Sequence, residues 1–261
     1  MTMKAMKAII LAAGRGSRMQ GMTDDKPKCL TRLAGKTLLD WQLLALNAMG
    51  IDHIAVVRGY LAEQLQSKRF SSLDNPRWPE TNMVVTLTCA SALLLNNTCI
   101  VSYADIVYNA SHIEKLILAT GDIVLTYDRL WESLWQERFT DPLSDAETFK
   151  EKRGQLLEIG DKAQSMTEIA GQYMGLLKFT PKGWKIVEKQ LNKLSQNQLD
   201  RLDMTALLRL LLEQGVAINV VPVDGKWCEV DSEHDLRLYE KKISQVDKSD
   251  GCWMHDWRGK L

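Results

Sequence analysis

A short loop near the start of the chain combines small residues with positive charges. Residues 14–18 read Gly-Arg-Gly-Ser-Arg, and Lys28 follows the turn-forming Pro27. Glycine permits positive φ angles and leaves no Cβ in the way of a close ligand. Backbone N–H groups in such a turn bind anions, and Arg18 and Lys28 add mobile positive charges. The pattern predicts a cradle for a polyphosphate, with a cation at each end.

A carboxylate follows a later apolar segment. Residues 98–105 read as a strand that ends in Asp105. In open α/β sheets, ligands gather at the carboxyl ends of the strands. Magnesium prefers carboxylate and phosphate oxygens, so Asp105 is predicted as a Mg²⁺ ligand. The alternative is a structural aspartate that caps the next turn.

Alternating strand and helix patterns must position these groups. The apolar run at 8–11 precedes the glycine loop, a helical pattern follows at 38–49, and a second strand follows at 53–57. Successive strand, helix and strand segments imply a parallel sheet with right-handed crossovers. Further strands are expected at 98–105, 122–128, 171–179 and 217–223, a hairpin at 147–159, and helices at 61–68, 182–192, 206–213 and 236–243.

The glycine loop also carries a recognisable signature. It does not fit the dinucleotide fingerprint, because Met19 stands at the third glycine position, and no P-loop Gly-Lys-Ser/Thr follows. It resembles the signature of nucleotidyltransferases that activate phosphorylated sugars and alcohols with an NTP. The resemblance implies a single-domain α/β fold, Rossmann-like or GT-A-like: a three-layer sandwich with a mixed, mainly parallel sheet. The matching residues are Leu11-Ala12-Ala13-Gly14-x-Gly16-Ser17-Arg18-Met19 and Pro27-Lys28-x-Leu30.

The resemblance implies which residues hold the nucleotide. Leu11 to Gly14, Gly16 and Ser17 correspond to its binding loop, and Gly59 borders it. Asn82 and Thr86 match positions that contact the base in the phosphocholine cytidylyltransferase branch. A helix cap at Asn82 and a buried polar role for Thr86 are the alternatives.

The same resemblance implies an acceptor site, through a thinner match. Lys162 keeps the cation of a lysine motif that meets the acceptor phosphate, although its neighbours depart from the family pattern, and a solvated lysine is the alternative. Tyr173 lies in a strand beside the acceptor. Trp131 and Trp135 stand one helical turn apart, where their faces could bind a quaternary ammonium, or where they could simply pack.

Catalytic and metal roles follow from the two ends of the match. Residues 227–236 resemble the closing motif of the family, in which Asp231 matches the second metal ligand. The resemblance implies that the neighbouring Glu229 shares the metal, or that it positions Lys28. The implied reaction is direct nucleotidyl transfer with Mg²⁺. Lys28 would hold the α-phosphate and the attacking oxygen together, and Arg18 would neutralise the β- and γ-phosphates.

Composition limits the other possibilities. The 261 residues are 25% charged with zero net charge, which is ordinary for a globular protein and offers no basic tract for nucleic acid. We expect no membrane span, and five scattered cysteines fit reduced thiols in a cytoplasm. Residues 1–245 are predicted as the nucleotidyltransferase domain. Residues 246–261 are predicted as a tail that covers an apolar patch or joins a homodimer interface.

Several functions stay open at this stage. We favour CTP with a small phosphorylated alcohol or phosphonate, such as phosphocholine, in cell-surface polysaccharide or phosphonate biosynthesis. A sugar-1-phosphate nucleotidylyltransferase using UTP, GTP or dTTP is the alternative. A non-catalytic nucleotide-sugar sensor is the other, and the intact Arg18, Lys28, Asp105 and Asp231 argue against it.

Overall fold

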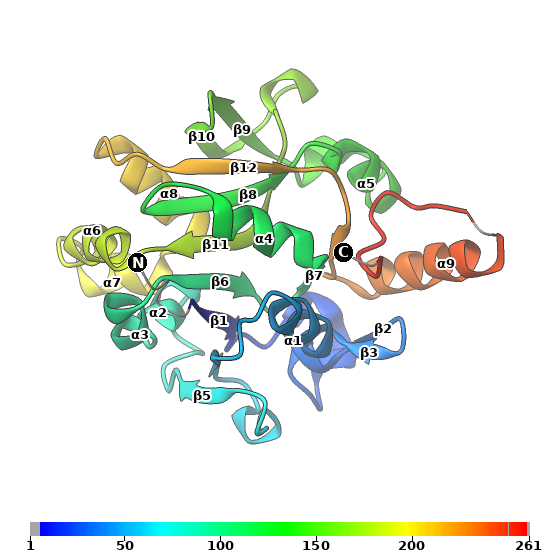
Figure 1. The fold of residues 1–261 in the computed structure, drawn as a ribbon, viewed down its shortest axis with the longest axis horizontal. Coiled ribbons are helices and arrows are strands. Elements are labelled where there is room, and N and C mark those ends of the chain that lie inside the picture. Colours follow the sequence, from blue (N-terminus) through cyan, green and yellow to red (C-terminus); the bar gives the residue numbers. More distant parts are fainter. Residues whose placement is uncertain (1–5, 250, 260–261) are drawn as a thin grey trace.

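The chain folds around one large sheet, described here from a computed structural model that covers residues 6–249 and 251–259. Nine strands form the sheet, and all run in one direction except β11 and β10 (Figure 1). The predicted mixed, mainly parallel sheet is therefore confirmed. The strand order is β5 (Ser71–Asp74), β4 (Ile54–Arg58), β1 (Lys7–Ala12), β6 (Cys99–Tyr103), β11 (Gln172–Phe179), β8 (Ile123–Asp128), β12 (Asn219–Val223), β10 (Gln155–Lys162) and β9 (Glu147–Lys152).

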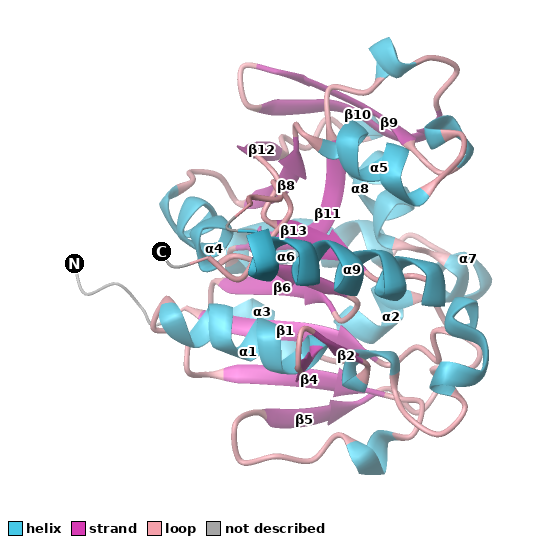
Figure 2. Cartoon of the chain, turned by 90° about the vertical axis from the view of Figure 1, so that its right-hand side faces the viewer, coloured by secondary structure: helices cyan, strands magenta, loops and turns pink. Residues whose placement is uncertain are grey.

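Helices cover both faces, which gives the predicted three layers (Figure 2). Alternate residues of β1 point into two separate cores, Ile10 into one and Ile9 into the other. This period of two is why each core needs its own helical layer. The first core packs against α1 (Leu38–Ala48), α4 (Ala110–Leu118), α5 (Trp131–Arg138) and α9 (Glu233–Ser249); the second packs against α2 (Met83–Thr88), α3 (Ser91–Asn96), α6 (Pro181–Leu191), α7 (Gln196–Arg201) and α8 (Met204–Glu213).

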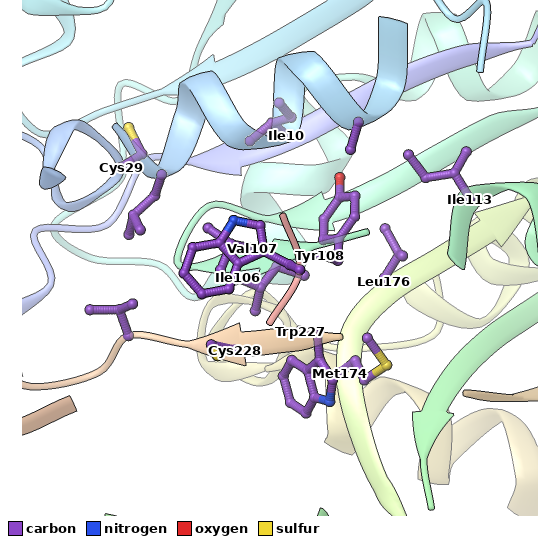
Figure 3. Close-up of a cluster of buried hydrophobic side chains, with 14 of the residues drawn as sticks. Ile10, Cys29, Ile106, Val107, Tyr108, Ile113, Met174, Leu176, Trp227 and Cys228 are labelled. Atoms are coloured by element: carbon purple, nitrogen blue, oxygen red, sulfur yellow. The ribbon is translucent and has the colours of Figure 1, made fainter. Parts of the chain in front are cut away.

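Two small ribbons stand beside the main sheet. One joins β2 (Arg32–Leu33) to β3 (Lys36–Thr37). The other pairs β7 (Ile106–Tyr108) antiparallel with β13 (Trp227–Glu229), and its buried side chains extend the first core (Figure 3). Short 3₁₀ turns complete the chain at η1 (Ser17–Thr23), η2 (Lys28–Leu30), η3 (Ala62–Gln64), η4 (Pro142–Ser144) and η5 (Met166–Glu168).

The helix expected at 61–68 is wrong. Only the η3 turn forms, after Leu61 in a left-handed conformation with φ of 47°. The Arg58 guanidinium donates to the carbonyls of Ala62 at 3.2 Å and Leu65 at 2.9 Å. Those carbonyls are thus satisfied without a helix, and the chain returns as the unexpected edge strand β5.

The C-terminal residues pack onto the body of the protein. Helix α9 runs through residue 245, the expected end of the domain, as far as Ser249. Trp257 is buried beside Trp41, with ring centroids 5.8 Å apart, and it belongs to the first core. Residues 1–5 of the predicted domain and residues 250, 260 and 261 of the predicted tail lie outside the part of the chain that the structure describes.

Candidate active site

A cavity of about 300 Å³ opens at the carboxyl ends of β1 and β6. The glycine loop, Lys28 and Asp105 all line it. Small residues that leave backbone accessible therefore lie beside charged groups in one cavity. The lining residues are Leu11, Ala12, Ala13, Gly14, Gly16, Ser17, Arg18, Lys28, Cys29, Trp78, Thr81, Asn82, Met83, Thr86, Tyr103, Ala104 and Asp105.

The glycine loop fits closely against Lys28. Gly16 has φ of 70°, and a Cβ built on it would come within 2.9 Å of the Lys28 side chain. Any larger residue would be strained by its own backbone and would push against that lysine. Gly14 has open space around it instead, so a ligand can approach its backbone. The two glycines thus serve different purposes.

The β7–β13 ribbon brings distant carboxylates together. Asp105 lies in the turn between β6 and β7, and Glu229 ends β13 opposite Ile106. The Val230 N–H donates to the Asp105 carbonyl at 2.9 Å, which places Asp231 next to the same turn. One carboxylate oxygen from each of Asp105, Glu229 and Asp231 lies within 4.8 Å of the others.

Lys28 bridges two of these carboxylates. Its Nζ donates to Asp105 Oδ2 at 2.8 Å and to Asp231 Oδ1 at 2.9 Å. Burial opposes its charge, but the two carboxylates outweigh burial and raise the pKa of Lys28. Arg18 reaches the same Asp231 Oδ1 at 2.9 Å, and its side chain is 67% exposed. Lys28 is therefore a buried, charged ammonium, and Arg18 is an exposed guanidinium that lines the same cavity.

The acidic cluster fits a divalent cation. Asp105 Oδ1 is buried and has no hydrogen-bond partner, so one acceptor in the cluster is unsatisfied. Burial of much of the Glu229 side chain and the neighbouring charge of Asp231 raise the pKa of Glu229 to about 8. Burial alone would raise the pKa of Asp231, but Lys28, Arg18 and Arg138 outweigh it and hold that pKa below its usual value. Crowded carboxylates with a spare oxygen are the donor set that hard cations prefer.

Asn82 and Thr86 line the cavity and also serve the fold. Asn82 caps α2 by accepting from the Met83 N–H at 2.7 Å. The buried Thr86 hydroxyl accepts from the Asn75 side chain at 3.1 Å. The structural roles of these two residues are therefore observed, and contact with the base stays a prediction that their place in the lining allows. Gly59 lies outside the lining: a Cβ on it would come within 2.6 Å of the Ala13 carbonyl and of Trp78, so it admits the Trp78 ring.

The expected acceptor residues do not converge on the cavity. Lys162 is exposed at the end of β10, opposite Glu147. Tyr173 packs edge-on against Tyr103, which itself lines the cavity, with centroids 5.8 Å apart. Trp131 and Trp135 are each 3% exposed, which favours packing over the aromatic cage. A ligand cannot reach a ring surface that other side chains already cover.

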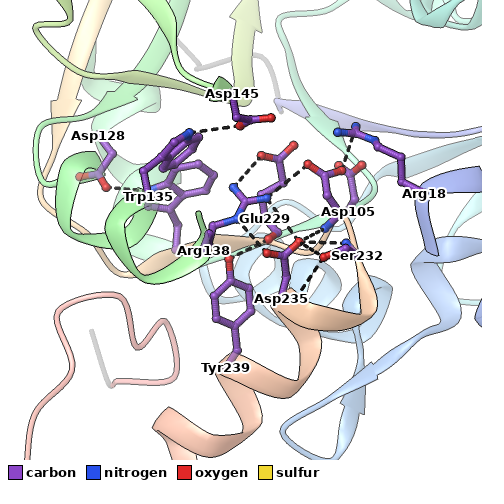
Figure 4. A network of polar contacts seen from close by, with 12 residues as sticks. Arg18, Asp105, Asp128, Trp135, Arg138, Asp145, Glu229, Ser232, Asp235 and Tyr239 are labelled. Atoms are coloured by element: carbon purple, nitrogen blue, oxygen red, sulfur yellow. Dashed lines mark hydrogen bonds and ion pairs between the residues drawn. The ribbon is translucent and has the colours of Figure 1, made fainter. Parts of the chain in front are cut away.

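Several site residues had no signal in the sequence. Trp78 lies in a proline-flanked loop, and only its approach to the glycine loop makes it a wall of the cavity. Arg138 is fully buried on α5, beneath the Trp135 ring, and contacts the acidic cluster (Figure 4). The charge of a lone arginine at the end of a helix is normally solvated, so nothing in the local pattern identified it.

The fold and this site define a class of protein. A sequence profile of the MobA-like NTP transferase domain matches residues 8–163. The inositol-1-phosphate CTP transferase of T. maritima has the same fold, with a TM-score of 0.72 at 19% identity, covering 96% of this chain and all of that one. The chain belongs to the MobA-like NTP transferase family and is a nucleotidyltransferase.

Two characterised relatives are more specific. The chain is 38% identical over 254 residues to the CTP:phosphoglutamine cytidylyltransferase of Campylobacter jejuni subsp. jejuni, covering 91% of this chain and 100% of that protein. A shorter match of 59 residues, 48% identical, joins it to the choline-phosphate cytidylyltransferase of Streptococcus pneumoniae, covering 23% and 26% of the two chains.

Proposed function

We propose that this protein transfers CMP from CTP to a small phosphorylated acceptor and releases pyrophosphate. The observation that carries the proposal is the similarity, along the whole of that relative, to a CTP:phosphoglutamine cytidylyltransferase. The charged groups of the cavity support it, because such a reaction joins two anions and needs cations between them. Phosphoglutamine is the first acceptor to test. Phosphocholine and a small phosphonate, expected from the sequence motifs, come next.

The reaction requires no covalent intermediate on the protein. An oxygen of the acceptor phosphate attacks the α-phosphorus of CTP, a new O–P bond forms, and the bond to the β-phosphate oxygen breaks as pyrophosphate leaves. Lys28 lies between the glycine loop and the carboxylates, where its ammonium can move from Asp231 to the α-phosphate. The exposed Arg18 side chain can exchange Asp231 for the phosphates of the leaving pyrophosphate. Positioning and charge stabilisation would supply most of the catalysis.

We assign Mg²⁺ as the cofactor, held by Asp105, Asp231 and Glu229. When bound, the ion would screen the repulsion between the nucleotide and acceptor phosphates. Asn82 and Thr86 remain the proposed contacts to the base. Tyr173 and Lys162 lie outside the cavity lining, so their contact with the acceptor remains a prediction from the sequence alone. Among the described residues, no helix is long and apolar enough to cross a membrane. We propose a cytoplasmic location, where CTP is available. A homodimer remains a prediction that sedimentation velocity would check.

A substrate panel tests the proposed function. Pyrophosphate release is measured with CTP, UTP, GTP and dTTP, each against phosphoglutamine, phosphocholine, 2-aminoethylphosphonate, inositol 1-phosphate and glucose 1-phosphate. We expect release with CTP and a small phosphorylated acceptor. Release with glucose 1-phosphate alone, or with another nucleotide alone, would contradict the proposal.

Lys28 provides the matched mutational test. Lys28→Ala should lower kcat at least a few hundredfold, the usual scale for a lost charge contact in the transition state. Lys26→Ala removes the same charge two residues away, from a side chain outside the cavity lining, and should leave kcat nearly unchanged. Equal activities in the two variants would refute the role of Lys28.

A further inference from the structure

Arg138 contacts the acidic cluster from the side away from the cavity. Its side chain has no exposed area, although arginine is rarely buried without a reason. Its Cζ lies 4.9 Å from the ring centroids of both Trp135 and Phe139, so two aromatic rings flank the guanidinium. This packing fixes the orientation of the side chain and excludes water from it.

The guanidinium contacts three carboxylates at once. Its Nε donates to Asp235 Oδ1 at 2.9 Å, and its terminal nitrogens lie 3.4 Å from Asp231 Oδ2 and 3.5 Å from Glu229 Oε2. Two of these carboxylates belong to the proposed cation site. A planar, delocalised cation with five donors suits this arrangement, and a lysine ammonium would not.

Asp231 is thereby held at two points. Its Oδ2 faces Arg138, while its Oδ1 accepts from Lys28 and Arg18. Asp235, the main partner of Arg138, also accepts from the Asp231 N–H at 3.0 Å. Arg138 therefore fixes both the carboxylate and, through Asp235, the backbone of the same residue. Figure 4 shows Arg18 and Arg138 on opposite sides of the cluster.

We expect the cations around Asp231 to respond differently when substrate binds. Lys28 and Arg18 line the cavity, so incoming phosphates can draw them away from Asp231. Arg138 lies outside the lining and keeps its three partners. A buried ion cluster is weak evidence for stability, and the fixed contacts of Arg138 with three carboxylates point to a role in geometry instead.

We propose that Arg138 is a positioning residue that holds Asp231 and Glu229 so that they form a cation site before substrate arrives. The proposal rests on the proposed function for the cation site and for the use of that site in the reaction. Partners behind metal ligands typically change metal affinity 10–100-fold when removed.

Direct Mn²⁺ binding, followed by the EPR signal of the free ion, tests this without turnover. The parent protein is the Lys28→Met variant, because removing Nζ frees Asp105 Oδ2 and leaves the exposed Arg18 side chain, which a cation can displace, on Asp231 Oδ1. In that background, Arg138→Gln should weaken Mn²⁺ binding at least about 10-fold. Arg138→Lys should also weaken it, by a smaller factor, because one ammonium cannot hold three carboxylates. Arg129→Gln, which removes an exposed arginine paired with Asp224, should change nothing.

Circular dichroism establishes that each variant is folded, and if Arg138→Gln is not, Arg138→Lys decides. Unchanged or tighter Mn²⁺ binding in the folded Arg138 variant would overturn the proposal. So would a parent protein that binds no Mn²⁺, since Arg138 would then have no cation site to prepare. The substrate panel on the unmodified enzyme reports the proposed function separately.

Discussion

The ammonium group of Lys28 joins parts of the chain that are far apart in sequence. Its two carboxylate partners lie 77 and 203 residues further on. The carboxylate oxygens of Asp105 and Asp231, the buried Lys28 ammonium and the exposed Arg18 guanidinium form one charge network. In this network the two cations can change partners, and the carboxylates stay in place. At this scale, the arrangement of the site depends on a few atoms held by close contacts.

Gly16 is one such position. Gly16→Ala should lower the free energy of unfolding by about 1–2 kcal/mol, because its φ of 70° and the contact with Lys28 both disfavour a Cβ. Gly14→Ala is the matched control, since a Cβ there meets nothing within 4 Å, and its stability should stay within about 0.5 kcal/mol. Chemical denaturation measures both. Equal losses in the two variants would contradict the packing argument.

Residues in contiguous motifs could be predicted, and residues that act through tertiary contacts could not. The glycine loop and Lys28 form a local pattern whose chemistry can be read directly. Arg138 and Trp78 acquire their places only from the packing of α5 and of the loop before α2. Trp131 and Trp135 show the converse: two aromatic residues at helical spacing fit a ligand cage and a core equally well, and burial decides for the core.

At the scale of elements, the β7–β13 ribbon determines the site. Its antiparallel pairing sets Glu229 beside Ile106 and draws Asp231 to Asp105. The C-terminal segment supports this ribbon: the Lys226 N–H donates to the Met254 carbonyl at 2.7 Å. The Asn109 side chain donates to the Trp257 carbonyl at 3.0 Å. The tail is therefore part of the scaffold that carries the acidic residues.

Trp257 tests this support. Trp257→Ala should lower the free energy of unfolding by about 3–5 kcal/mol, the usual range for removing a buried tryptophan. Met254→Ala alters a neighbouring side chain that is 54% exposed, and it should change stability by less than about 0.5 kcal/mol. Denaturant titration followed by circular dichroism gives both values. A small loss at Trp257 would mean that the tail packs only loosely.

Most elements could be predicted from hydrophobic period, and the exceptions have local causes. The strands at 98–105, 122–128 and 171–179 correspond to β6, β8 and β11 because their apolar runs are long and bounded by turns. The 61–68 segment has leucines at helical spacing, but the Arg58 side chain satisfies its carbonyls in another conformation. Such a contact between a strand and the next loop cannot be read from the loop itself.

For the molecule as a whole, the buried His112 on α4 makes the free energy of unfolding depend on pH. His112 is 2% exposed, and burial lowers its pKa to about 3, with help from Lys115 and Lys226. The unfolded chain binds a proton below about pH 6.5, and the folded chain does not until about pH 3. His112 therefore lowers the free energy of unfolding by nothing above about pH 6.5, and by a growing amount as the pH drops toward 3.

His112→Leu should remove this dependence. The difference in unfolding free energy between the natural protein and the variant should change by about 1.4 kcal/mol per pH unit between pH 6 and pH 4, in favour of the variant as the pH falls. Urea titrations at several pH values measure it. Parallel stability curves for the two proteins would show that His112 is protonated without unfolding.

The charged residues, the β7–β13 ribbon and the main sheet all contribute to the cavity at the ends of β1 and β6. A crystal structure with CTP and Mn²⁺ tests most directly whether this cavity binds the nucleotide and the ion. We predict the triphosphate over the glycine loop, Lys28 moved to the α-phosphate, and the ion between Asp105 and Asp231. A nucleotide bound elsewhere, or an ion that contacts neither aspartate, would contradict the account.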